Sequence, residues 1–134
     1  MATLEWLQPP DWPRPKGYRN GVVVRGGAWV VLAGQVGWDE REKIVAGGLV
    51  PQFEQALRNV LTLVRLAGGA PEHLVSLRIY VTDRQAYLSS QRELGEAYRR
   101  LMGKHFACMS GLVVAGLVEE GALVELEGVA VIPD

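Results

Sequence analysis

Cysteine and histidine are scarce in this sequence. Cys108 is the single cysteine, and His73 and His105 are the two histidines. One thiol cannot form an internal disulfide, and two distant histidines fit none of the familiar zinc-binding spacings. We therefore expect a reducing compartment and a fold that needs neither a disulfide nor a structural metal.

An excess of charge of one sign is also missing. The chain has 14 Lys and Arg residues against 15 Asp and Glu residues, which gives a formal net charge of −1. Nucleic-acid-binding proteins generally carry a basic surface that neutralises phosphates, so a nucleic-acid partner is not expected. The phosphate-loop, dinucleotide-binding and zinc-protease motifs are absent, and no organic cofactor or metal is expected.

Long hydrophobic runs are absent as well. The apolar runs near Val30 and Leu112 are short and interrupted by glycine, whereas a membrane-spanning helix needs about 18 consecutive apolar residues. The first residues include Glu5 and several prolines, which is unlike a secretory signal. These absences predict a cytoplasmic protein without a membrane span.

The composition that remains is typical of a globular domain. Of the 134 residues, 49% are hydrophobic and 22% are charged. A chain of this length buries enough apolar surface to form a core without covalent cross-links. We expect one domain over residues 1–134.

The N-terminal part predicts an extended segment followed by a hairpin. Residues 1–17 are rich in Pro and Trp, so this segment is expected to lie unpaired over the body, held there by Trp6 and Trp12. The apolar runs at 21–25 and 28–33 flank a pair of glycines. This pattern predicts a β-hairpin.

The rest of the chain alternates between strand and helix patterns. The predicted elements are a short strand at 43–45, helices at 51–67 and 86–102, and strands at 72–83, 110–117 and 122–132. This order predicts an α+β fold, in which one mixed sheet has both helices on the same face. The other face carries many apolar side chains, so we expect it to be buried by association.

Two groups of residues have side chains suited to chemistry. Cys108 and His105 could form a nucleophile and base, but a small structural thiol is the preferred interpretation, and His73 is expected to face solvent. Glu125 and Glu127 share one face of an interior strand. Partial desolvation there could raise a carboxyl pKa into a range useful for proton transfer, although an ordinary ion pair with an arginine remains the alternative.

Five short segments carry a resemblance to a known family. They are Gly17–Gly21 (GYRNG), Ala33–Gly37 (AGQVG), Gln55–Val60 (QALRNV), Arg78–Asp83 (RIYVTD) and Ala122–Ala130 (ALVELEGVA). In this order they resemble the RidA/YjgF superfamily of reactive intermediate deaminases. The resemblance spans nearly the whole chain.

The resemblance implies a fold, an assembly and a reaction. It implies a chorismate-mutase-like fold and a homotrimer, whose sheets form a central barrel and whose small-molecule clefts lie at the subunit interfaces. The best-known members hydrolyse enamines and imines to ketoacids and ammonia without a metal or organic cofactor. By this resemblance Glu125 positions the water, assisted by Tyr18 and by the backbone of Ala33 and Gly34.

One family residue is missing from this chain. Family members bind the substrate carboxylate with an arginine before the penultimate strand, and this sequence has Met109 there. Methionine cannot bind a carboxylate, so efficient hydrolysis of 2-aminoacrylate is not expected. Arg78 could replace the arginine, although pairing with Glu125 or Glu127 is the preferred interpretation. Gln91, near an asparagine of the family, is a weaker candidate for a ligand contact.

These observations leave two leading hypotheses about function. The first is a trimeric enzyme that hydrolyses a small, less acidic imine, enamine or amide of nitrogen metabolism by glutamate-positioned water. The second is a ligand-binding or regulatory trimer that kept the fold without deaminase activity. A third interpretation, ribonuclease activity as attributed to some relatives, is disfavoured by the neutral charge.

Overall fold

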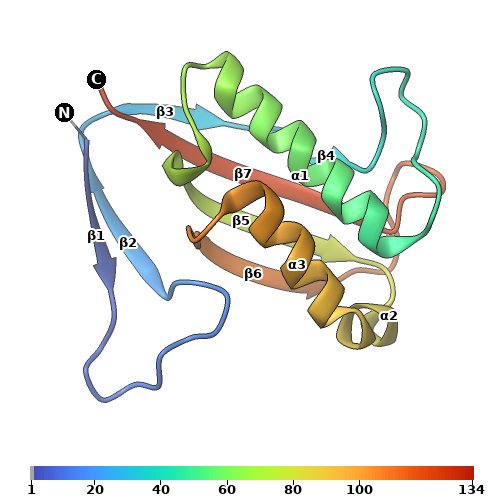
Figure 1. Cartoon of the computed structure of the whole chain (residues 1–134), viewed down its shortest axis with the longest axis horizontal. Helices are drawn as coiled ribbons and strands as arrows, with labels where there is room; N and C mark the ends of the chain where they lie inside the picture. The colour runs from blue at the N-terminus through green and yellow to red at the C-terminus, as the bar shows by residue number, and fades with distance from the viewer. Residues whose placement is uncertain (1) are drawn as a thin grey trace.

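Five strands form a mixed sheet at the centre of the molecule (Figure 1). The computed structural model describes residues 2–134. The strands are β3 (Ala28–Val31), β4 (Gln35–Val36), β5 (Leu74–Val81), β6 (Cys108–Val113) and β7 (Val124–Ile132). They are ordered β3-β7-β5-β6, and β4 also pairs with β7. β5 and β6 run parallel, whereas β7 runs antiparallel to its neighbours. The predicted α+β fold with a mixed sheet is confirmed.

A separate two-stranded ribbon precedes this sheet. It pairs β1 (Thr3–Leu7) with β2 (Gly21–Arg25) in antiparallel register, and Figure 1 shows it standing apart from the five-stranded sheet. The expectation that residues 1–17 lie unpaired is therefore wrong. The prolines begin at Pro9, after β1 has ended, so they leave its backbone free to pair.

The predicted hairpin between residues 21 and 33 is also wrong. β2 pairs with β1, and β3 pairs with β7 in the larger sheet. Gly26 and Gly27 both have positive φ, at 74° and 82°, and left-handed backbone of this kind is accessible to glycine at little cost. Here the two glycines lead the chain from one sheet into the other instead of folding it back on itself.

The first long helix follows the predicted apolar stripe. α1 (Leu49–Leu66) begins two residues before the predicted start at Pro51 and buries seven side chains. These are Gln52, Phe53, Ala56, Leu57, Val60, Leu61 and Val64. The helix packs on β7. No helix among residues 2–134 has the length and apolar character needed to cross a membrane.

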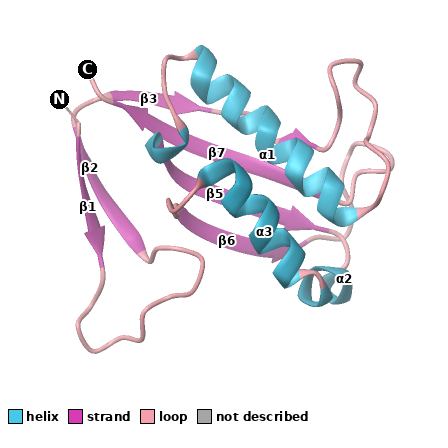
Figure 2. Ribbon diagram, viewed as in Figure 1, coloured by secondary structure: helices cyan, strands magenta, loops and turns pink. Residues whose placement is uncertain are grey.

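The second predicted helix is divided in two. After the 3-10 turn η1 (Pro71–His73) and β5, the chain forms α2 (Arg84–Ser89) and α3 (Gln91–Met102). Ser90 lies between them with φ −108° and ψ 12°. Serine competes with helical backbone through its own hydroxyl, and Ser89 donates to the carbonyl of Ala86 (3.2 Å). α1 and α3 lie side by side on the same face of the sheet, as predicted (Figure 2).

The two faces of the sheet differ in burial. Leu77, Ile79 and Leu126 point toward the helices and are buried in the core. The alternate residues point to the open face, where Trp29 and Val31 are 68% and 75% exposed. Buried and less buried side chains thus alternate along β5 and β7, and Glu125 and Glu127 share one face of β7, as predicted.

Two predicted strands are shorter in the structure than expected from the sequence. The expected strand at 43–45 is a single bridge between Trp38 and Ile44. The predicted strand at 110–117 ends as β6 at Val113, and the segment that follows is attached to α1 by Gln52. The Gln52 amide accepts from Leu123 N (2.8 Å) and donates to Gly121 O (3.2 Å).

Candidate functional site

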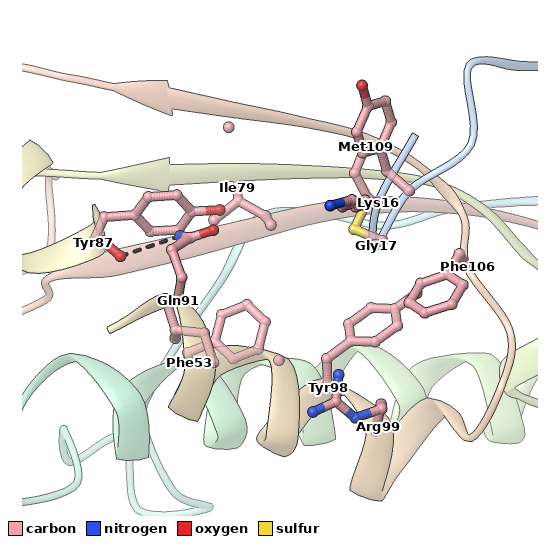
Figure 3. Close-up of a pocket in the computed structure, with 14 residues that line it drawn as sticks. Lys16, Gly17, Phe53, Ile79, Tyr87, Gln91, Tyr98, Arg99, Phe106 and Met109 are labelled. Atoms are coloured by element: carbon pink, nitrogen blue, oxygen red, sulfur yellow. Dashed lines mark hydrogen bonds between the residues drawn. The ribbon is translucent and has the colours of Figure 1, made fainter. Parts of the chain in front are cut away.

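A cavity of about 550 Å³ lies between α3, strand β6 and the loop before β2 (Figure 3). α3 contributes Gln91, Leu94, Gly95, Tyr98 and Arg99 to its wall. These positions are three or four residues apart and so lie on one helix face. The remaining lining residues are Lys16, Gly17, Tyr18, Phe53, Ile79, Tyr87, Phe106, Met109 and Gly111. Three predicted site residues, Tyr18, Gln91 and Met109, are thus brought together.

The floor of this cavity is apolar and well ordered by packing. Tyr98 is 5% exposed, and its ring stacks on Phe106 with centroids 5.6 Å apart. The Tyr98 hydroxyl donates to the carbonyl of His105 (3.0 Å) and accepts from Ala107 N (3.4 Å). Burial raises the pKa of Tyr98 to about 12, so this hydroxyl stays protonated and serves structure.

Met109 occupies the wall formed by the sheet. It lies opposite Leu77 of β5 in the parallel pairing and packs against the core on the helix side. Gln91 lines the cavity from α3, and its side-chain amide donates to the carbonyl of Tyr87 (3.1 Å), as Figure 3 shows. The position at which the family resemblance implies an arginine therefore adds an apolar thioether to the cavity.

Two cations of this cavity were missed by sequence reasoning. Arg99 and Lys16 were not among the predicted site residues; both side chains are exposed and line the cavity. A signal for Arg99 was present, since it follows Gln91 by eight residues and Gly95 by four, spacings that share a helix face. Nothing in the sequence pattern marked Lys16.

Glu125 lies elsewhere, beside Gly34. β4 pairs with β7 so that Val36 is opposite Glu125, and a Cβ on Gly34 would overlap the Glu125 carboxylate. Glu125 is half-buried, while Ala33 and Gly34 are exposed. Within residues 2–134 the Glu125 carboxylate has no ion pair or side-chain hydrogen bond. The predicted grouping of Glu125 with Ala33 and Gly34 thus exists within one chain.

Arg78 is engaged by the other glutamate of the strand. Its Nη1 is 3.9 Å from Glu127 Oε1, and the Tyr80 hydroxyl donates to the same oxygen (2.9 Å). This hydrogen bond from Tyr80 to Glu127 raises the pKa of Tyr80. Of the two predicted partners of Arg78 it is Glu127 that pairs, and the exposure of both side chains makes the ion pair weak.

The predicted site residues therefore form two groups that do not meet in one chain. Tyr18, Gln91 and Met109 line the cavity under α3 on the helix side of the sheet. Glu125 belongs to the alternate set of β7 residues, which faces the open side. A single site containing both groups requires a second copy of the chain.

The cysteine and histidines have structural surroundings. His105 Nε2 is 2.7 Å from the carbonyl of Leu74, and its ring lies 5.8 Å from that of Trp6. Burial raises the pKa of the Cys108 thiol, the opposite of what a nucleophile needs. His73, expected to face solvent, accepts from Ala70 N through Nδ1 (2.9 Å) and is half-buried.

Trp12 is exposed, and only Trp6 contacts the body among the two predicted anchors. Trp12 is 57% exposed, whereas Trp6 lies against His105 and under the guanidinium of Arg19, whose Cζ is 4.6 Å from the ring centroid. No three His, Cys, Asp or Glu side chains gather into a possible metal site in the part of the chain that the structure describes.

Comparison with known proteins gives consistent matches over most of the chain. A family model described as Endoribonuclease L-PSP matches residues 13–132. A 2-iminobutanoate/2-iminopropanoate deaminase of Homo sapiens is 25% identical over 103 residues, covering 76% of this chain and 72% of that protein. A RutC family protein of Aquifex aeolicus is 30% identical over 128 residues, covering 93% of this chain and 97% of that protein.

A solved structure agrees with these matches. The protein YyfB of Yersinia pestis, described as a Rid family protein of unknown function, has a TM-score of 0.85 and 26% identity, and the match covers 96% of this chain and 98% of that one. The similarity therefore extends over all the elements that form the cavity and the Glu125 strand. The family model, the relatives and the fold agree that this chain belongs to the RidA/YjgF superfamily.

Proposed function

We propose that the protein is a homotrimeric hydrolase of small imines or enamines, with its sites in clefts between copies. The observation that carries this proposal is the Glu125 carboxylate, which lies against Gly34 without an ion-pair partner among the described residues. A half-buried carboxylate that no cation neutralises is available to accept a proton from water. The human relative named as an imine deaminase supports this class of reaction.

Assembly is part of the proposal because one chain does not complete the site. The cavity with Tyr18 and Met109 opens on the helix side, whereas Glu125 faces the open side of the sheet. That open side also carries Trp29 and Val31, which are largely exposed in one chain. Burying this face against other copies removes the exposed apolar surface and can bring Glu125 of one copy to the cavity of another.

The reaction needs a water, a base and a polarised carbon. Glu125 accepts a proton from water while the water oxygen bonds to the imine carbon, and the imine nitrogen takes up a proton. Glu125 then returns its proton to the nitrogen of the carbinolamine, the C–N bond breaks, and the hydroxyl proton passes to solvent in place of the one that the imine nitrogen took up. One imine and one water thus give one ketone and one ammonia, and Glu125 is again a carboxylate. The backbone of Ala33 and Gly34 borders the carboxylate, and Tyr18 offers a hydroxyl from the cavity side.

The second candidate is a trimer that binds a small ligand without turning it over. The observation that favours it is Met109, which gives β6 no cation at the position implied for substrate binding. Ligand binding without ammonia release would distinguish this candidate from the first. Under either candidate we propose a cytoplasmic protein, and the net charge of −1 gives no support to nucleic-acid cleavage.

The test is a comparison of Glu125→Gln with Glu127→Gln. Freshly generated 2-aminoacrylate and 2-iminopropanoate are followed by ammonia release with wild type and with each variant. Losing the base is expected to lower the rate about 100-fold or more, while Glu127→Gln, on the same strand and face, keeps wild-type turnover. A Glu125→Gln protein as active as wild type would remove Glu125 from the mechanism.

The same assay with Met109→Arg examines the missing cation. Faster ammonia release by this variant than by wild type means that the water-positioning groups are intact and that the natural ligand differs. If no protein releases ammonia, the ligand-binding candidate replaces the enzyme.

A further inference from the structure

The cavity under α3 has an uneven balance of charge. Its lining includes the cations Lys16 and Arg99 but no aspartate or glutamate. Figure 3 shows Arg99 on the helix side and Lys16 on the side of the loop before β2. A concave surface lined by one sign of charge concentrates ligands of the opposite sign.

Neither cation is neutralised within residues 2–134. Several other arginines have partners: Arg78 pairs with Glu127, Arg100 pairs with Glu54 (2.6 Å), and Arg19 lies over the ring of Trp6. Arg99 and Lys16 have no ion pair and no side-chain hydrogen bond in this part of the chain. Their positive charge is therefore available to a ligand.

A glycine on α3 makes room for the Arg99 guanidinium. A Cβ at Gly95 would lie 3.3 Å from Arg99 Nη1, so the arginine side chain folds back along its own helix to line the cavity. Glycine inside a helix is destabilising by about 1 kcal/mol relative to alanine. The close approach of the Arg99 guanidinium explains why a glycine stands at position 95.

The remaining walls are apolar and aromatic. Tyr98 and Phe106 form a stacked pair, and Ile79, Leu94 and Met109 complete the apolar surface. The cavity volume in one chain is about 550 Å³, which leaves room for an apolar body beside the charged group of a ligand.

We propose that Arg99 and Lys16 are specificity-determining residues that bind an anionic ligand whose apolar body rests on the wall formed by Tyr98, Phe106 and Met109. The ligand class is a carboxylate with an aromatic or branched apolar body. The inference rests on the proposed function, because the bound anion is a substrate only if the protein is a hydrolase. It revises the expectation of a less acidic ligand, because the charge absent at Met109 is supplied from α3 and from the loop before β2.

The test measures binding of three unreactive probes by titration calorimetry. Phenylacetate has both the charge and the apolar body, phenylacetamide lacks the charge, and acetate lacks the body. We expect phenylacetate to bind about tenfold or more tightly than either of the others. Raising the NaCl concentration is expected to weaken phenylacetate binding and to leave phenylacetamide unchanged.

Single substitutions show which cation binds the carboxylate of phenylacetate. Arg99→Gln and Lys16→Gln are each expected to weaken phenylacetate binding about fivefold to tenfold and to leave phenylacetamide unchanged. The matched control is Arg92→Gln, since Arg92 is an exposed arginine of α3 that pairs with Glu96 outside the cavity. This control is expected to bind phenylacetate as wild type does.

Several results would overturn the inference, and they are separable from failure of the proposed hydrolysis. Equal affinity for phenylacetate and phenylacetamide, wild-type affinity in both Arg99→Gln and Lys16→Gln, or no phenylacetate binding at about 10 mM would each do so. Charge-dependent binding of phenylacetate without ammonia release, from the three-carbon substrates or from the 2-imino acid with a phenyl side chain, would contradict the hydrolase and leave the inference standing. Ammonia release with charge-independent binding would do the reverse.

Discussion

At the scale of single residues, Gly34 is explained by its neighbour. Any side chain there would overlap the Glu125 carboxylate, and the backbone of Gly34 has no positive φ that would itself require glycine. The absence of a Cβ at Gly34 therefore leaves room for the Glu125 carboxylate beside the Gly34 backbone.

Gly34→Ala is accordingly expected to displace the Glu125 carboxylate and to lower imine turnover about 100-fold, because small displacements of catalytic groups have large effects on rate. The control is Gly116→Ala, since a Cβ at Gly116 meets no atom within 4 Å. Ammonia release and the thermal unfolding midpoint are measured for both. Unchanged turnover in a folded Gly34→Ala protein would contradict this role.

Tyr98 makes a second prediction at this scale. Its folded-state pKa of about 12 lies above the ordinary value of 10.0, so the unfolded chain loses this proton first as pH rises. The contribution of Tyr98 to stability is complete below pH 10 and is lost between pH 10 and 12, with an upper limit of about 2 to 3 kcal/mol.

Tyr98→Phe removes this titration and also leaves the carbonyl of His105 without its donor. At pH 7 the variant is expected to be less stable by about 1 to 2 kcal/mol. The difference from wild type shrinks above pH 10, because only wild type loses stability through this group. Urea unfolding at pH 7, 10 and 11 checks both statements, and a difference independent of pH would refute the second.

At the scale of elements, α1 packs on β7 and contributes seven buried side chains to the core. Leu57 is fully buried at its centre, while Leu66 at its end is 84% exposed. The two residues belong to the same helix and have the same side chain, so they separate burial from helix propensity.

Leu57→Ala is expected to lower the free energy of unfolding by about 2 to 5 kcal/mol through lost burial and a cavity. Leu66→Ala is expected to change it by less than about 0.5 kcal/mol. Denaturant unfolding of both variants measures the contrast. Similar losses at the two positions would mean that α1 does not pack as described.

The elements also show where sequence patterns suffice. α1, β5 and β7 were predicted because each buries one regular face, and the apolar period of that face is visible in the sequence. The break at Ser90 and the pairing of β1 with β2 were not predicted. Strand pairing joins distant segments, and a local pattern does not name the partner.

At the scale of the whole molecule, the open face of the sheet exposes apolar side chains in one chain. Val31 is 75% exposed and lies opposite Val129 in the antiparallel pairing of β3 and β7. An apolar cross-strand pair of this kind is unusual on a solvent-facing surface unless another surface covers it.

Val31→Asp is therefore expected to weaken the proposed trimer at least about tenfold, because it places a charge on the exposed apolar face that the proposed assembly would bury. Val118→Asp, at a fully exposed loop residue, serves as the control. Light scattering after size-exclusion chromatography reports the mass of each. A Val31→Asp protein that keeps the mass of three chains would exclude this face as the interface.

The candidate site divides in the same way between local and non-local information. The sequence alone determined the fold class, the apolar faces of α1, β5 and β7, and the identities of Glu125 and Met109, because these depend on local period and on residue type. The family resemblance was likewise carried by short segments in order.

Only the tertiary structure decided which of these residues meet. Glu125 and the cavity lie on different faces of the sheet, and Arg78 forms an ion pair with Glu127. The Arg99 side chain passes close to Gly95 and lines the cavity. The physical reason is that such contacts join segments distant in sequence or depend on side-chain direction. Both are fixed by packing of the whole chain rather than by local pattern.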